Sequence, residues 1–418
     1  MLLAKKNMLV FGVPYWMPMF PNWRKSFAAA YFGAQLFSGL WGRMDVYVYN
    51  VGAGNFIRVL WDCPNNNQKE LIVDCGSKNG IGAIERIIAS GEKIDRLRAG
   101  TREIRETMLW VTHLHEDHYN GLGIEEGMKH ELCSRIGTII IGGSIEQAKQ
   151  CGDFGHWIEQ RIQQKKPVLC LQIGNYKQPN IKEVTKNLNS FQNGCVGNLK
   201  LFAIVPVSKY YKLNNGDNEN AQSLVLGIEY NGVKILFPGD APGKIFQALP
   251  EKSKDFVQNT NILIAPHHGS FEADNEWWWA YDRDLGNSPL YCVIASCDPR
   301  GHRKWNLPKE EFQEKGKGYM AFRKRQSSKT VAYYNKCTTR YYIKKTYQAK
   351  FVTCTTEYGY HVVVKDEPSE LLAKIKIFQM RQFTNGNFWE MEMEMLDTRN
   401  ESGAILVMPS DREEEITS

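Results

Sequence analysis

Hydrophobic residues in this chain occur mostly in short runs of strand length that end at glycine, asparagine or clustered polar residues. Residues 44–61 (MDVYVYNVGAGNFIRVLW) alternate and then run apolar around Gly52 and Gly54, which predicts a hairpin with one strand on each side. Asn231 and Gly232 predict a second, tight hairpin. Apolar runs predict further strands at residues 71–74, 108–111, 136–141, 199–207, 223–230, 233–237, 262–265 and 291–295.

Helical periodicity appears in two places. Ile84, Ile87 and Ile88 form one apolar face within residues 81–90, and residues 144–166 are mostly helical in pattern. Strands precede helices in two successive sets, one before and one after about residue 200. This order predicts an α/β fold in which two sheets pack together with helices outside, an αββα sandwich.

The N-terminal segment, residues 1–43, differs from the rest of the chain because it is rich in aromatic residues and proline. Residues 26–42 carry no charge, but this apolar length falls just short of a membrane span, and Gly33 and Gly39 weaken it further. The segment fits an atypical signal segment, a membrane-surface helix or a packing extension of the core, and we favour the packing extension. Alternatively, Met44 is the natural start.

The C-terminal segment, residues 366–418, is predicted to be a small extension of the main domain. Residues 369–380, just after Pro368, are typical of a short amphipathic helix. The run WEMEMEML at residues 389–396 alternates like a strand with one acidic face. We expect these elements to cap the core or to meet a partner protein whose identity the sequence does not indicate.

The composition is that of a folded protein, since 43% of the 418 residues are hydrophobic and 23% are charged. The net charge of +6 is too modest to establish a nucleic-acid partner on its own. The ten cysteines form no CxxC pair and no regular spacing, which argues against a zinc ribbon and a disulfide scaffold. We therefore expect a reducing, cytoplasmic location with no obligate membrane span, and membrane association through residues 26–42 stays open.

The most informative stretch follows the predicted strand at residues 108–111. His113, His115, Asp117 and His118 arrive there within six residues, as HLHEDH. Imidazoles two residues apart on an extended turn can bind one ion, and adjacent Asp and His residues at the start of a helix can turn toward a second ion. The spacing predicts a two-metal hydrolytic site.

Two later strands are followed by residues of the same kind. Asp240 comes directly after the strand at residues 233–237, and a glycine before it lets the backbone turn sharply, so we predict that it bridges the two ions. His267 and His268 follow the strand at residues 262–265. One of this pair is expected to bind metal while the other orients or protonates the substrate, and we favour His268 as the ligand.

Three further roles complete the predicted site. Asp117 is expected to be both a ligand and a catalytic residue. His302 follows the strand at residues 291–295 and is a candidate proton donor to the leaving oxygen. Asp74, at the end of the strand at residues 71–74, is placed either to accept the free N–H of a ligand histidine or to cap a turn.

Taken in order, these motifs resemble one branch of the metallo-β-lactamase superfamily, the hydrolase-like domain of the bacterial competence DNA-uptake channel and its free-standing relatives. The matching elements are NVGAGN at residues 50–55, VDCGS with Asp74, HLHEDH at residues 113–118, NAQSLVL at residues 220–226, GD with Asp240, HHGS from His267 and GH with His302. The resemblance covers residues 44–365. It implies a metallo-β-lactamase-type αββα sandwich and a hydrolase with two divalent ions.

The chain departs from this branch at two points. Asn50 and Asn55 stand where the branch has acids, which removes negative charge from the neighbourhood of the site. The histidine that many superfamily members place between HxHxDH and GD has no clear counterpart, and Asn220 and Ser223 occupy that region. The resemblance therefore implies that the first metal is short of one protein ligand and binds more weakly.

The ligand set indicates the chemistry better than the substrate. Nitrogen and oxygen donors without a thiolate suit zinc, manganese or iron, and a water that bridges two such ions is ready for hydrolytic attack. Residues 322–347 interleave lysine and arginine with tyrosine, which suits either a nucleic-acid groove or a protected sheet edge. Residues 277–279 (WWW) suit an aromatic wall or core packing.

We therefore expect a phosphodiesterase or nuclease-like enzyme that uses zinc or manganese on DNA, RNA or a nucleotide. The alternatives are a hydrolase of another bond, namely a phosphocholine ester, a thioester or a lactam, and a metal-binding module with weak catalysis.

Overall fold

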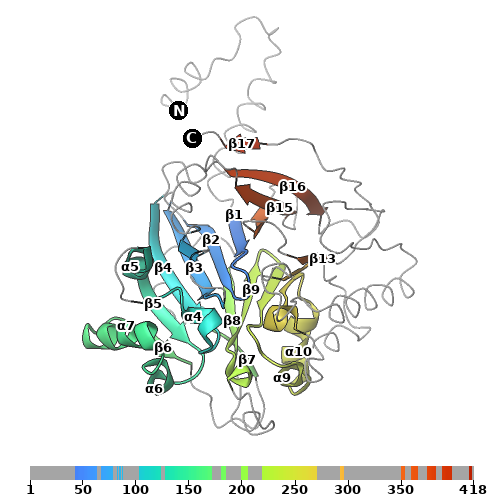
Figure 1. Cartoon of the computed structure of the whole chain (residues 1–418). Helices are drawn as coiled ribbons and strands as arrows, with labels where there is room; N and C mark the ends of the chain where they lie inside the picture. Colours follow the sequence, from blue (N-terminus) through green and yellow to red (C-terminus); the bar gives the residue numbers. More distant parts are fainter. Residues whose placement is uncertain are drawn as a thin grey trace, which may run out of the picture. The chain divides into compact units, whose positions relative to one another are not determined.

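The chain divides into two compact units, Met1–Trp41 and Gly42–Ser418. The computed structural model, drawn in Figure 1, describes residues 43–63, 67–78, 82, 84, 85, 87, 103–123, 128–171, 180–184, 199–205, 219–270, 292–295, 350–353, 359–365, 374–382, 388–397 and 414–416. All of them belong to the second unit. Apart from Arg43, the predicted N-terminal extension lies outside the described residues.

The first sheet has ten strands, in the order β17-β16-β15-β14-β1-β2-β3-β4-β5-β6. Neighbouring strands are antiparallel from β17 to β3 and parallel from β3 to β6. Its strands are β1 Arg43–Tyr49, β2 Phe56–Cys63, β3 Asn67–Cys75, β4 Glu103–Val111, β5 Ile136–Ile141, β6 Val168–Cys170, β14 Gly359–Lys365, β15 Lys374–Gln382, β16 Phe388–Asp397 and β17 Glu414–Ile416.

The second sheet follows the same plan, with an antiparallel part and then a parallel part. Its strand order is β13-β12-β11-β10-β9-β8-β7, antiparallel from β7 to β10 and parallel from β10 to β13. Its strands are β7 Asn180–Glu183, β8 Lys200–Val205, β9 Val225–Tyr230, β10 Val233–Phe237, β11 Ile262–Ile264, β12 Cys292–Ala295 and β13 Lys350–Thr353. Asn231 and Gly232 both have positive φ in the β9–β10 turn, which confirms the predicted tight hairpin.

The main hydrophobic core contains side chains from both sheets, so the sheets pack against each other. Val46 and Met108 from the first sheet share this core with Leu226 and Ile235 from the second. The indole Nε1 of Trp110, within the same core, donates a hydrogen bond to a carbonyl oxygen of the loop before β9 at 2.9 Å. Alternate residues along β1 and β4 contribute to a second core on the other face of the first sheet, as the period-two pattern requires.

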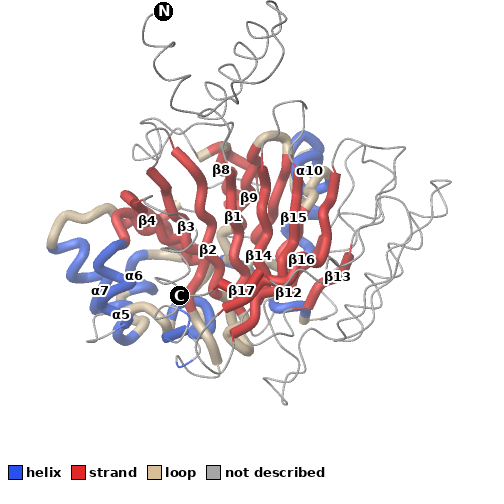
Figure 2. Tube along the Cα trace, turned by 90° about the horizontal axis from the view of Figure 1, so that it is seen from above, coloured by secondary structure: helices blue, strands red, loops and turns tan. Residues whose placement is uncertain are grey.

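Helices cover the outer faces. The described helices beside the sheets are α5 Met128–Arg135, α6 Ile145–Ala148, α7 Gly152–Gln163, α9 Gly243–Gln247 and α10 Glu251–Gln258. Phe154 and Ile158 of α7 belong to the outer core of the first sheet, and Figure 2 shows α5, α6 and α7 grouped at this side. Phe256 of α10 packs on Phe202 of the second sheet, with ring centroids 4.6 Å apart. The prediction of a mixed α/β fold with two sheets is therefore confirmed.

Residues 144–166 are mostly helical, as predicted, and they form two helices, α6 and α7, with Gly152 at φ +53 where α7 begins. The helix predicted at residues 369–380 is wrong, since residues 374–382 form strand β15. The run KIKIFQ has the period-two alternation of a strand, and β15 pairs with β14 on one side and β16 on the other.

The remaining predicted elements have mixed outcomes. Ile84 and Ile87 are helical and buried, and the strand predicted at residues 389–396 is β16. Five strands, β6, β7, β13, β14 and β17, were not predicted. In the described part of the chain, no helix has the length and apolar character needed to span a membrane.

Candidate metal centre

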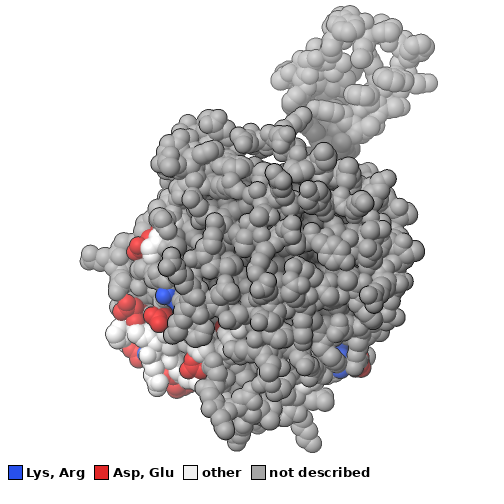
Figure 3. Space-filling model, turned by 45° about the vertical axis from the view of Figure 1, so that its right-hand side comes forward, with Lys and Arg blue, Asp and Glu red and all other residues white. Residues whose placement is uncertain are grey.

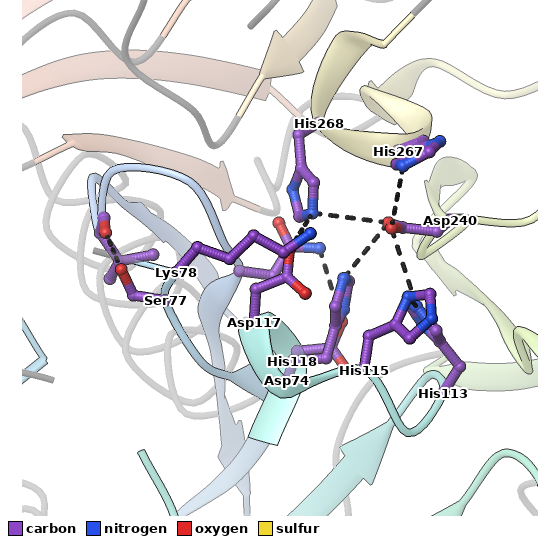
Figure 4. Close-up of polar contacts among 12 residues, drawn as sticks. Asp74, Ser77, Lys78, His113, His115, Asp117, His118, Asp240, His267 and His268 are labelled. Carbon is purple, nitrogen blue, oxygen red and sulfur yellow. Dashed lines mark hydrogen bonds and ion pairs between the residues drawn. The ribbon is translucent and has the colours of Figure 1, made fainter. Parts of the chain in front are cut away.

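The predicted ligands come together at the carboxyl ends of β3, β4, β10 and β11. Strands β3 and β4 are parallel in one sheet, and β10 and β11 are parallel in the other, so each pair delivers its following loops to one edge. The side chains that meet there are Asp74, His113, His115, Asp117, His118, Asp240, His267 and His268 (Figure 4).

Two glycines allow the loops to approach each other. A Cβ on Gly76, after β3, would lie 2.4 Å from the backbone carbon of Asp117. A Cβ on Gly239, after β10, would lie 2.7 Å from the side chain of Thr112, and Gly239 also has φ +59. Only a residue without a side chain fits at these two positions, so the glycines set the spacing between the ligand loops.

The backbone is strained at three of the site residues. Asp74, His267 and His268 have φ values of 55, 45 and 54, in the left-handed region that non-glycine residues rarely adopt. The two histidines lie in the 3-10 helix η5 Pro266–Gly269, immediately after β11. Strain of this kind persists only where the surroundings hold it, and it is concentrated at functional sites.

The first group of candidate ligands consists of His113, His115 and Asp240. The Nε2 atom of His113 lies 3.0 Å from Nδ1 of His115 and 3.7 Å from Oδ2 of Asp240. His113 is fully buried, whereas 23% of the His115 side chain is exposed. The opposite nitrogen of His115, Nε2, lies 2.9 Å from a carboxylate oxygen of Glu219, which leaves Nδ1 facing the other ligands.

The second group consists of Asp117, His118 and His268, all of which are buried. Asp117 and His118 are carried by the short helix α4 Glu116–Tyr119. The Oδ2 atom of Asp117 lies 3.2 Å from Nε2 of His268. A further cation, the Nζ atom of Lys78, lies 3.1 Å from the same oxygen.

Asp240 connects the two groups through its two carboxylate oxygens. Its Oδ1 atom lies 3.3 Å from Nε2 of His118 and 3.7 Å from Nε2 of His268. Its Oδ2 atom faces His113 at 3.7 Å and Nε2 of His267 at 3.6 Å. One oxygen therefore points into each group, which is the arrangement of a carboxylate that bridges two ions.

Asp74 contacts His118 at Nδ1, the ring nitrogen opposite the one that faces Asp240. Its Oδ2 atom accepts a hydrogen bond from Nδ1 of His118 at 2.7 Å, and its Oδ1 atom accepts one from the backbone N–H of Thr112, also at 2.7 Å. The side-chain amide of Asn55 lies 3.5 Å from Oδ2 of Asp74. Because Nδ1 of His118 is engaged, its Nε2 is the nitrogen that faces Asp240, as expected for a ligand histidine oriented by an outer carboxylate.

The charged side chains of the site shift one another's pKa values. Burial alone would lower the pKa of His118, but the carboxylates of Asp240 and Asp74 outweigh it and raise this pKa to about 10. Burial, reinforced by the positive charge of His118, holds the pKa of His113 well below its usual range. Burial would raise the pKa values of Asp117 and Asp240, yet the surrounding histidines lower both. Without metal, the site is a mixture of buried carboxylates and imidazolium.

Several buried polar atoms lack a hydrogen-bond partner in the described part of the chain. They include Oδ1 of Asp117, Nε2 of His118 and Oδ1 of Asp240, whereas Oδ2 of Asp117 has the side-chain nitrogens of Lys78 and His268 within 3.2 Å. Ligands about 2.0–2.1 Å from a tetrahedral ion lie about 3.3 Å apart, close to the separations observed here. Buried polar atoms that face one another at this spacing without a hydrogen bond fit a metal ion between them. Each group can therefore hold a metal ion.

The structure brings together all six residues predicted as ligands, although their role as ligands remains a prediction. His268 is buried within the second group, whereas 16% of the His267 side chain is exposed at the edge of the site. Asn50 accepts a hydrogen bond from the backbone N–H of Gly52 at 3.1 Å and is a turn residue. His302, the WWW run and the basic, tyrosine-rich segment lie outside the described residues.

Three contacts of the site were not predicted from the sequence. Lys78 contacts Asp117, Glu219 contacts His115, and Thr112 hydrogen-bonds Asp74. Lys78 directly follows the VDCGS motif and Thr112 directly precedes the HLHEDH motif. Adjacency to a motif could therefore have indicated that both residues belong to the site. Glu219 likewise directly precedes the NAQSLVL motif, although the motif itself does not indicate a contact with His115.

The sequence matches no protein-family model and no curated protein. One similar solved structure is that of a protein from Parabacteroides distasonis ATCC 8503, named for a proposed metal-dependent hydrolase activity. The two chains are 12% identical, the match covers 60% of this chain and 100% of the other, and the TM-score is 0.25. A TM-score this low carries no argument about fold or function, so the candidate metal centre rests on its own geometry.

Proposed function

We propose that this protein is a hydrolase of the metallo-β-lactamase type that binds two divalent ions, zinc or manganese, and cleaves phosphodiesters. The observation that carries the proposal is Asp240, which directs one carboxylate oxygen to each ligand group. A structural site for one ion needs no such shared carboxylate. A pair of sites joined by one carboxylate is the arrangement of two-metal hydrolases.

The fold supports this proposal. Each sheet combines an antiparallel part with parallel strands, the two sheets share a core, and helices lie on their outer faces. The ligands lie on loops at the ends of strands from both sheets, as the resemblance to the superfamily implies. We therefore propose the metallo-β-lactamase sandwich as the finer description of the two-sheet fold.

In the proposed mechanism, the first group, which includes Asp240, would hold one ion, and the second group together with Asp240 would hold the other. When bound, two divalent ions lower the pKa of a water and stabilise negative charge on a phosphoryl oxygen. Asp74 fixes the ring of His118 so that its Nε2 faces the site. His267 lies at the exposed edge with Nε2 3.6 Å from Asp240, where it can orient the substrate or donate a proton.

The substrate is proposed to be DNA, RNA or a nucleotide. Support comes from the motif resemblance and from the lysines, arginines and tyrosines of residues 322–347. Among the described charged side chains of the face in Figure 3, acidic ones are more frequent than basic ones. Acidic side chains repel a polyanion, so we expect nucleic acid to approach away from them.

The experiment uses chelator-treated protein reloaded with Mn²⁺ or Zn²⁺. We expect two equivalents of metal by elemental analysis, and metal-dependent cleavage of bis(p-nitrophenyl) phosphate and single-stranded DNA. An Asp117→Ala, Asp240→Ala double variant is the blank, and circular dichroism shows whether it remains folded. Metal binding without cleavage above this blank contradicts the proposed hydrolase activity.

A second candidate is a metal-binding module with weak catalysis. It is favoured by the first group, which has three ligands, one of them the partly exposed His115. Elemental analysis separates the candidates, since the module should retain about one equivalent of metal after dialysis, whereas the enzyme should retain two.

A further inference from the structure

We propose that Lys78 binds the negatively charged group of the substrate, and that it leaves Asp117 when an ion occupies the second group. This inference rests on the proposed two-metal site. Figure 4 shows Lys78 reaching from the loop after β3 toward Asp117. Its Nζ atom lies 3.1 Å from Oδ2 of Asp117, the same oxygen that faces His268 at 3.2 Å.

The base of Lys78 is fixed by hydrogen bonds. The backbone N–H of Lys78 donates to the carbonyl of Ala53 at 2.7 Å. The preceding residue, Ser77, is held by the side chain of Asn120, which accepts from its N–H at 2.9 Å and donates to its carbonyl at 2.8 Å. Asn120 directly follows the helix that carries Asp117. The start of the lysine side chain is therefore tied to the element that carries two of the ligands.

The end of the side chain is less constrained than its base. The Lys78 side chain is 42% exposed, while the Asp117 side chain it contacts is 1% exposed. A lysine ammonium is a compact charge on a flexible four-carbon stem, so it can move several ångströms without any change in the backbone. Lys78 therefore borders both the buried ligand cluster and the solvent from which a substrate arrives.

Electrostatics favour an exchange of partners. In the protein without metal, the ammonium of Lys78 offsets the buried negative charge of Asp117. A divalent ion at the same oxygen repels the ammonium because both are positive. A phosphate group bound beside the ions offers the ammonium an anionic partner there. Lys78 would thus favour anionic esters over neutral ones.

The first measurement is metal and phosphate binding to Lys78→Met, Lys78→Arg and wild-type protein by calorimetry. Without phosphate, we expect Lys78→Met to bind Mn²⁺ in the second group at least about threefold more tightly, because a competing cation is removed. Inorganic phosphate should bind the metal-loaded Lys78→Met protein about tenfold more weakly than wild type. Lys78→Arg should restore most of the phosphate affinity.

Lys200→Met is the matched control. Lys200 has a similarly exposed side chain, at 44%, and is paired with Glu229 at 3.0 Å on the second sheet. Its replacement removes the same charge from a surface position outside the ligand cluster. We expect it to leave metal and phosphate binding unchanged.

A second measurement compares substrates. The ratio of kcat/KM for bis(p-nitrophenyl) phosphate to kcat/KM for neutral p-nitrophenyl acetate should fall about tenfold in Lys78→Met. Equal phosphate affinity in Lys78→Met and wild type would overturn the proposal, as would weaker metal binding in Lys78→Met, which would show a structural role. If wild-type protein binds no metal, the proposed function and this inference fail together, and that result is distinct from the other two.

Discussion

The two ligand groups contain the same kinds of side chain but differ in burial and in support. The second group, Asp117, His118 and His268, is buried and is backed by Asp74, which has no exposed surface. The first group includes the partly exposed His115, whose outer carboxylate, Glu219, has a side chain that is 51% exposed. Buried charges are screened less than exposed ones, so an ion in the second group should be held more tightly.

This difference suggests a division of roles. The second group has a fixed histidine orientation and a preformed spacing, which favours an ion that remains bound. The first group opens toward solvent through His115, which favours exchange of an ion or approach of a substrate. The predicted weakness of the first metal therefore has a structural basis in exposure as well as in the number of ligands.

The change with the largest expected effect removes the residue that the groups share. Asp240→Ala should abolish binding of the second metal equivalent and reduce kcat/KM by about 10³-fold or more. This loss exceeds the roughly 10- to 100-fold loss that is typical when a residue hydrogen-bonded to a metal ligand is replaced. Metal analysis and phosphodiesterase assays measure the two effects. Asp255→Asn, on an exposed position of α10, is the control and should behave like wild type. Two retained equivalents in Asp240→Ala would show that the groups are independent.

Removing the support of the second group should have the next largest effect. In Asp74→Asn the left-handed backbone remains tolerable, because asparagine adopts it readily, but the carboxylate that orients His118 is lost. We expect the affinity for the ion in the second group to fall about 10- to 100-fold while the first group is affected less. Competition with a fluorescent chelator measures both sites. Asp62→Asn, on β2, provides the control, and equal losses at both sites would remove the distinction between the groups.

The two groups should also respond differently to pH. In the metal-free protein the pKa of His118 is raised from 6.5 to about 10, so a metal ion must displace a proton from it. The affinity of the second group should therefore rise about tenfold from pH 7.5 to 8.5. The pKa of His113 is lowered, so this histidine adds no such dependence to the first group. Calorimetry in buffers of different ionisation enthalpy measures the released proton, and no proton release by the second site would contradict this expectation.

The raised pKa of His118 also determines how the stability of the metal-free protein depends on pH. A raised pKa in the folded state means that the folded protein binds the proton more tightly than the unfolded chain does. The contribution of His118 is therefore complete below about pH 6.5 and is lost as the pH rises toward 10. Thermal unfolding of chelator-treated protein should show a lower Tm at pH 9 than at pH 7. A His118→Gln variant should lose this part of the pH dependence.

Much of the fold and site follows from local patterns in the sequence. Apolar runs that end at polar residues located most strands, and the HLHEDH spacing brought four candidate ligands together just after one strand. Asp240 was predicted as the shared carboxylate because an acid follows a glycine at the end of a buried strand. These features depend on neighbours in the chain, which is why they could be predicted.

The features that were missed depend on contacts between distant parts of the chain. Lys78 and Glu219 were not singled out, because their partners Asp117 and His115 are reached only after loops from different strands converge. The β15 error arose because residues 369–380 have apolar positions that fit a helix at one end. The pairing of residues 374–380 with β14 outweighs that local preference.

The smallest effect is expected for the exposed support of the first group. In Glu219→Gln, an amide of nearly the same shape replaces the carboxylate that lies 2.9 Å from Nε2 of His115. The contact that orients the His115 ring is therefore weakened without a change in side-chain size. Because Glu219 is half exposed, water can replace it, and the affinity of the first group should fall only about two- to fivefold. Chelator competition can resolve such a change when Glu229→Gln is measured alongside as the control. A loss as large as that of Asp74→Asn would show that the first group depends on its outer carboxylate as strongly as the second does, and exposure would then no longer explain the difference between them.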